Sequence, residues 1–118
     1  MFQKKKKTKK KREHKPSILQ VKDGSCYLCM MEGNYRKYAI VHKHHIFSGT
    51  ANRTISEAEG FICYLCPDHH EFSSAAVHRN AENMIRLRRI AQREYEKTHT
   101  REEFMDLIGR NYLQEDEE

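Results

Sequence analysis

Two short motifs of the same spacing limit what this chain can fold into. Two residues separate Cys26 from Cys29, and two residues separate Cys66 from His69 much later in the chain. Each pair can face one ion from a single tight turn, and two such pairs complete the closed tetrahedral set of a structural zinc site. We therefore expect a zinc ion that ties two distant segments together. The alternative is a group of buried thiols beside a surface histidine.

Such a tie matters because the chain can build only a modest core. It has 118 residues, of which 37% are hydrophobic, and domains of this kind often need a metal or disulfides for stability. A disulfide framework is not expected, because no apolar export signal follows the lysine-rich start. Zinc binding would instead add its free energy to that of folding. The remaining cysteine, Cys63, falls in an apolar pattern and is expected in the core.

Apolar patterns around the motifs predict a small α+β domain. The expected elements are, in chain order, a strand at 38–41, a loop at 48–55, a helical turn at 56–60 capped by Ser56 and ended by Gly60, a strand at 61–65 and a helix from Pro67. Residues 18–21 are either a short strand or a first apolar contact with the core.

Helices are expected to complete the C-terminal part of the chain. Apolar residues at spacings of three and four predict a helix from about 79 to 99, with arginines on its opposite face. Those arginines are either DNA contacts or solvated charges. Thr100 and Glu103 have the capping-box pattern of a second helix, and Gly109 is a natural stop.

Histidines gather where the strands and the helix after them are expected to meet. His44 and His45 follow the first strand, His70 lies at the start of the helix, and His78 comes eight residues later. Neighbouring strand residues point to opposite faces, so one imidazole of the pair can bind a metal while the other faces a substrate. Hydrolysis of a phosphodiester needs both a cation that stabilises charge on the phosphate and a base that takes a proton from water.

From Cys26 to about His78 the chain resembles the HNH endonucleases, in which paired CxxC and CxxC/H motifs surround a ββα-metal motif. The matching residues are His44-His45-Ile46 and the run from Leu65 to His70. The whole stretch from about 25 to 113 is also similar to small HNH proteins encoded by phages and prophages. The resemblance implies a ββα-metal fold braced by a structural zinc and followed by C-terminal helices. It also implies a metal-dependent endonuclease that hydrolyses phosphodiester bonds in DNA.

The resemblance assigns roles to the histidines. It implies His44 and His70 as ligands of a catalytic divalent ion and His45 as the general base. His78 is the preferred third ligand, with Asn80 in reserve. Imidazole ligands are compatible with Mg²⁺, Mn²⁺, Ni²⁺ or Zn²⁺, so the residue types do not choose the ion.

The middle asparagine of the family is missing where the second strand should begin, since Gly60 and Phe61 stand there. Asn52, in the expected loop, either takes over its loop-shaping role or the role is absent. For DNA binding we single out three cationic residues near the motif, although ordinary surface charge would explain each equally well: Lys43, Arg53 and Arg79.

Charge is concentrated at the two ends of the chain. Residues 1–16 carry nine Lys or Arg against one Glu, and residues 115–118 are all acidic, within a net charge of +5. We expect a disordered basic tail at 1–16, a nuclease domain at 17–114 and an acidic tail at 115–118. A flexible cationic arm suits a nucleic acid partner. No apolar run reaches the roughly 20 residues of a membrane span, so we expect a soluble, cytoplasmic protein with neither membrane nor small-molecule partners.

Two other functions are compatible with the same residues. The chain could be a non-catalytic zinc module that binds DNA or a protein, with histidines that play no part in catalysis. It could also be an assembly protein of a phage, in which the charged ends make the contacts.

Overall fold

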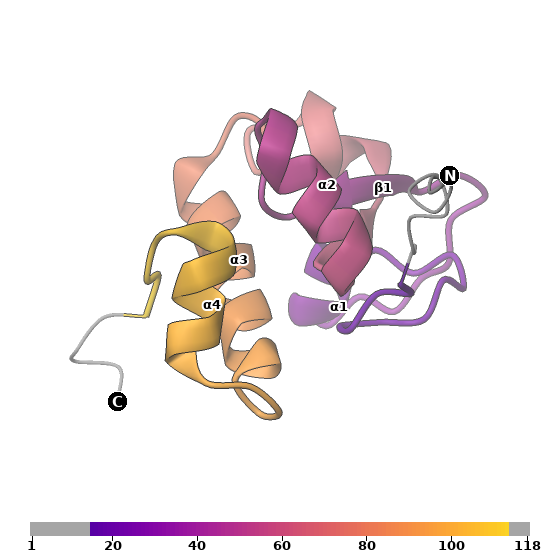
Figure 1. Ribbon diagram of the computed structural model, residues 1–118. Helices are drawn as coiled ribbons and strands as arrows, with labels where there is room; N and C mark the ends of the chain where they lie inside the picture. The colour runs from indigo at the N-terminus through magenta and orange to yellow at the C-terminus, as the bar shows by residue number, and fades with distance from the viewer. Residues whose placement is uncertain (1–14, 114–118) are drawn as a thin grey trace, which may run out of the picture.

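The computed structural model describes residues 15–113 and has a small mixed α+β fold (Figure 1). Most of the basic tail expected at 1–16 and all of the acidic tail expected at 115–118 lie outside the described residues. The elements are, in chain order, α1 Tyr27–Met31, β1 His42–His45, α2 Thr50–Glu59, β2 Ile62–Leu65, the π-helical turn η2 Asp68–Phe72, α3 Ala81–Tyr95 and α4 Arg101–Ile108.

The sheet is a two-stranded antiparallel pair in which His42 lies opposite Leu65 and His44 opposite Cys63. The expected second strand is confirmed to within one residue, and all four residues of β2 are buried. The strand expected at 38–41 is wrong, because the histidines themselves form β1. Tyr38 instead donates its backbone N–H to the carbonyl of Gly24, and Ile40 is exposed, so this β-prone segment is not part of the sheet.

Helix α2 begins at Thr50, so it replaces most of the loop expected at 48–55, and it contacts β1 (Figure 1). Gly60 ends it in the left-handed conformation, as the sequence predicts, but Ser56 does not cap it. Ser56 lies inside the helix and is fully buried, where its hydroxyl donates to the carbonyl of Phe47 at 3.0 Å. The Ser56 hydroxyl, which the local sequence pattern assigns to a helix N-cap, is therefore used in a tertiary hydrogen bond to Phe47.

Aromatic side chains from the strand ends and the C-terminal helices form the centre of the core. Phe47 and Phe61 lie 5.2 Å apart between ring centroids, and Phe104 of α4 packs against both at 5.6 and 6.0 Å. The capping box of Thr100 and Glu103 is present, as predicted. Helix α3 ends at Tyr95, a few residues before the expected 99, and a turn joins it to α4.

Arg88 of α3 packs against this core rather than forming part of a free basic face. Its Nε donates to the carbonyl of Ile46 at 2.9 Å, and its guanidinium lies over the ring of Phe47. These contacts fasten α3 to the segment that follows β1.

Within residues 15–113, no helix combines the length and apolar character required to cross a bilayer.

The turn at Gly60 fixes how α2 leads into β2 and should be sensitive to substitution. Gly60 and Gly109 both end helices with a positive φ, of 79° and 85°. A Cβ at Gly60 would overlap the carbonyl oxygen of Pro16, whereas a Cβ at Gly109 would meet no atom of the described residues within 4 Å.

We therefore expect Gly109→Ala to lower the free energy of unfolding by about 1 kcal/mol, and Gly60→Ala by about 2 to 4 kcal/mol. Denaturant titration of the two zinc-loaded variants measures the difference. Equal losses would show that the Pro16 segment does not pack against this turn.

Candidate metal centres

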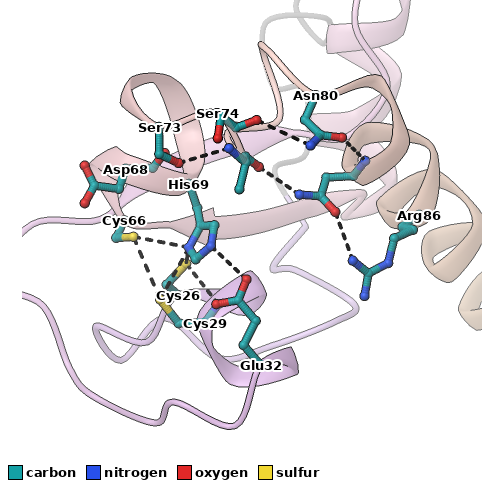
Figure 2. Close-up of polar contacts among 12 residues, drawn as sticks. Cys26, Cys29, Glu32, Cys66, Asp68, His69, Ser73, Ser74, Asn80 and Arg86 are labelled. Carbon is teal, nitrogen blue, oxygen red and sulfur yellow. Dashed lines mark hydrogen bonds and ion pairs between the residues drawn. The ribbon is translucent and has the colours of Figure 1, made fainter.

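Four sulfur and nitrogen atoms converge between α1 and η2 (Figure 2). Cys26 and Cys29 come from the start of α1, Cys66 follows β2, and His69 lies in η2. All four residues are buried, and their ligand atoms lie within 4.8 Å of one another. These are the four residues that the two spaced motifs predict.

Distances within the cluster match those of a tetrahedral zinc site. Nδ1 of His69 lies 3.4 Å from Sγ of Cys26, 3.4 Å from Sγ of Cys29 and 3.5 Å from Sγ of Cys66. The sulfurs of Cys29 and Cys66 are 3.9 Å apart. Bonds of the usual zinc lengths give edges of about 3.6 Å between nitrogen and sulfur and about 3.8 Å between sulfurs. The cluster could therefore hold a metal ion such as zinc.

Neighbouring groups orient the ligands and control their charge. Oε2 of Glu32 lies 3.1 Å from Nε2 of His69 and can accept a hydrogen bond from Nε2–H, which leaves the lone pair of Nδ1 to face the sulfurs (Figure 2). Burial raises the pKa of the Cys26 thiol to about 12. A cation bonded directly to the sulfur would be needed to keep this thiol ionised at neutral pH. Cys63 is fully buried within β2 and takes no part in the cluster.

A second cluster consists of three histidines. His44 of β1, His70 of η2 and the exposed His78 place one ring nitrogen each within 4.8 Å of one another. Nε2 of His70 and Nε2 of His78 are 3.1 Å apart. Nε2 of His44 is buried and has no hydrogen-bond partner among the described residues. An orphaned buried nitrogen beside two other imidazoles fits a metal ligand, because a cation would satisfy its lone pair.

Sheet topology explains how three distant histidines meet. Since the start of β1 pairs with the end of β2, the turn η2 that follows Leu65 lies beside the first residues of β1. The chain after η2 then folds back, and Val77 donates its N–H to the carbonyl of His69 at 2.8 Å. This bond brings His78 against His70.

The environment favours the neutral form of His44 and His70. Burial, followed by the nearby His70 and His78, lowers the pKa of His44 to about 3. Burial likewise lowers the pKa of His70. Neutral imidazole is the form that binds metal, so His44 and His70 are ready to act as ligands at physiological pH.

His45 lies on the other side of β1 from His44 and is paired with a carboxylate. Its Nε2 is 2.7 Å from Oε2 of Glu57, a residue of α2, and Lys43 donates to the same oxygen at 3.0 Å. No described residue bonds to Nδ1 of His45. His44 and His45 nevertheless line one cavity of about 280 Å³, whose walls are Lys43, His44, His45, Ser48, Arg53, His70 and His78.

Three residues singled out from the sequence lie elsewhere. Asn80, the reserve ligand, caps α3: it accepts from the N–H of Asn83 at 3.0 Å and donates to the carbonyl of Ser74 at 3.3 Å (Figure 2). His78 occupies the cluster instead. Arg79 is exposed and does not line the cavity, and Asn52 lies in α2 rather than in a loop.

Sequence reasoning missed the carboxylates that support the histidines. Nothing local marks Glu57, because its approach to His45 depends on the unexpected helix α2. Glu32 likewise reaches His69 from the end of α1. His42 was also missed, although its spacing of two from His44 places both on one face of a strand.

Comparisons with protein-family models, with curated proteins and with solved structures find no match. A function for this chain therefore has to be argued from its own residues. Those residues offer one cluster that could hold a metal and one cavity where three imidazoles lie near a fourth that is paired with a carboxylate.

Proposed function

We propose that this protein is a metal-dependent endonuclease of the HNH type that hydrolyses phosphodiester bonds in DNA. One observation carries the proposal: three imidazoles that could share a cation line the same cavity as His45, which is paired with Glu57. The order of two antiparallel strands followed by a helical turn, with His44 and His45 on the first strand, supports the ββα-metal resemblance.

His45 is the general base of the proposed reaction. Glu57 accepts the hydrogen of Nε2, so the lone pair of His45 lies on Nδ1. That nitrogen takes a proton from the attacking water, and the Glu57 carboxylate stabilises the imidazolium that forms, as the aspartate does in a serine protease. The resemblance further implies attack in line with the leaving 3′-oxygen and a 5′-phosphate on the product.

His44, His70 and His78 would hold the catalytic divalent ion. When bound, such an ion supplies positive charge that stabilises the phosphate and the leaving oxygen. Three imidazole ligands without a carboxylate favour Mn²⁺, Ni²⁺ or Zn²⁺ over Mg²⁺, which prefers oxygen. The Cys26, Cys29, Cys66 and His69 cluster would hold a second, structural zinc with no open position.

Arg53 is the cavity residue best placed to hold a substrate phosphate, because Lys43 is already paired with Glu57. We expect Arg53→Ala to weaken DNA binding and to reduce the slope of log affinity against log salt by about 1. The matched control is Arg79→Ala, which removes the same charge outside the cavity. Both changes are made in a His45→Ala background so that binding is measured without cleavage. If the two substitutions weaken DNA binding equally, Arg53 contributes only to the general electrostatic attraction of DNA and not to a phosphate contact in the cavity.

The test of the proposed function is a cleavage panel on the zinc-loaded protein. Supercoiled, linear, single-stranded and branched DNA are each incubated with Mg²⁺, Mn²⁺, Ni²⁺ or Zn²⁺, and the products are examined for 5′-phosphate ends. We expect cleavage of at least one DNA structure that depends on the added ion. DNA binding without cleavage under any condition would favour the non-catalytic zinc module, and no affinity for DNA at low salt would favour an assembly role.

A further inference from the structure

A fourth histidine touches the proposed metal site without belonging to its ligands. His42 lies two residues before His44 on β1, and its Nδ1 is 2.9 Å from Nδ1 of His70. The two rings meet edge to face, with centroids 4.9 Å apart. The ligand nitrogens that could share a cation belong to His44, His70 and His78. His42 therefore contacts the far side of a ligand.

We propose that His42 is a positioning residue for the histidine metal site: its Nδ1 accepts a hydrogen bond from Nδ1–H of His70, so that His70 offers Nε2 to the ion. The inference rests on the proposed function, because it concerns the same site. It assigns a role to a residue that neither the motif spacing nor the resemblance singles out.

The argument depends on how a neutral imidazole carries its single proton. His70 has both ring nitrogens in contact with other imidazoles, Nδ1 with His42 and Nε2 with His78. With the proton on Nε2, that nitrogen has no lone pair for a metal. With the proton on Nδ1, the Nδ1–H group needs a hydrogen-bond acceptor, and the lone pair of Nε2 is then free to bind the ion. A hydrogen bond to His42 therefore selects the tautomer that binds metal.

Among the described residues, the acceptor within hydrogen-bond distance of Nδ1 of His70 is Nδ1 of His42. Within residues 15–113, the closest carboxylate oxygen is Oε2 of Glu71, which is 3.7 Å from Nδ1 of His70 and so beyond hydrogen-bond distance, and the Glu71 side chain is half exposed. Metal-binding histidines usually donate their second N–H to a carboxylate, a carbonyl or water. Here a partly buried imidazole takes that place, and it must then carry its own proton on Nε2.

Direct measurement of metal affinity tests this role without relying on activity. Mn²⁺ is titrated into the full-length, zinc-loaded protein, and free Mn²⁺ is followed by its electron paramagnetic resonance signal. We expect His42→Phe, which keeps a ring but has no acceptor, to weaken Mn²⁺ binding 10- to 100-fold. His42→Asn places Oδ1 where Nδ1 stood, and it should restore affinity to within about threefold of the parent. Zinc content and melting temperature should be unchanged in both variants.

Two controls make each outcome decisive. Glu71→Gln should leave Mn²⁺ affinity unchanged, because Glu71 is not the acceptor. If His42→Phe does not fold, His42→Ala removes the acceptor without added bulk and is compared with His42→Asn in the same way. Parental affinity in the variant without an acceptor, or failure of His42→Asn to restore it, would overturn the inference alone. A parent protein that binds no Mn²⁺, Ni²⁺ or Zn²⁺ at the histidines would overturn both the inference and the proposed function.

Discussion

Replacing Cys26 with serine is expected to leave a chain that neither retains zinc nor folds cooperatively. Cys26 is fully buried and contributes one of three sulfurs that converge on Nδ1 of His69. Structural zinc sites contribute about 10 to 16 kcal/mol of apparent binding free energy. That figure equals or exceeds the whole stability of a typical small domain, about 5 to 15 kcal/mol. Loss of the site should therefore unfold this protein.

Zinc content by mass spectrometry and circular dichroism of the purified variant measure this effect. The matched control is Cys63→Ala, since Cys63 is equally buried in β2 but lies outside the cluster. We expect the control to retain one structural zinc per chain and a cooperative unfolding transition. A Cys26→Ser protein that is folded and free of zinc would contradict the structural role of the cluster.

Replacing His45 with alanine is expected to reduce DNA cleavage by about 10² to 10⁴, the usual contribution of a general base. Stability should change little. Glu57 loses one partner, but Lys43 still bonds to the same carboxylate oxygen at 3.0 Å, so the partly buried charge is not left alone. Zinc content should equal that of the parent, because His45 lies outside the cysteine cluster.

The measurement is the single-turnover rate of plasmid nicking with enzyme in excess. His99→Ala serves as the matched control, since His99 stacks on Tyr95 in the turn after α3 and does not line the cavity. Parental rates in the control and a large loss in His45→Ala would support the proposed base. If both variants cleave at the parental rate, His45 is not the base.

The turn η2 links the two clusters, because His69 and His70 are neighbours in the chain. His69 faces the sulfurs of the first cluster, while His70 faces His44 and His78. A metal held by the first cluster would fix η2 and thereby the position of His70. Metal binding at the cysteine cluster would therefore influence the geometry of the proposed catalytic site directly through η2, with no intervening element.

Short-range patterns were enough to predict the parts of the fold that depend on local chemistry. The four residues of the cysteine cluster follow from two spacings, and the Thr100–Glu103 capping box follows from one. Strand β2 follows from a short apolar run that is buried on both sides. In each case the signal is a spacing or a run within a few neighbouring residues, even where those residues then meet a distant segment, as in the cysteine cluster.

Contacts between distant segments account for what the sequence did not predict. Pairing with β2 makes a strand of His42–His45, whereas the more β-prone segment before it has no such partner. Helix α2 uses Ser56 to bond Phe47, and the same helix presents Glu57 to His45. The carboxylate half of the proposed base therefore could not be predicted until the position of α2 was known.

Anomalous diffraction from crystals grown with Zn²⁺ and soaked in Mn²⁺ tests the central claim most directly, because it locates each metal by element. The account predicts a zinc signal bonded to Cys26, Cys29, Cys66 and His69. It also predicts a separate manganese signal bonded to His44, His70 and His78, in the cavity that His45 lines. A cysteine cluster that holds zinc beside a histidine cluster that binds no metal would contradict the assignment of this cavity as a metal-dependent nuclease site.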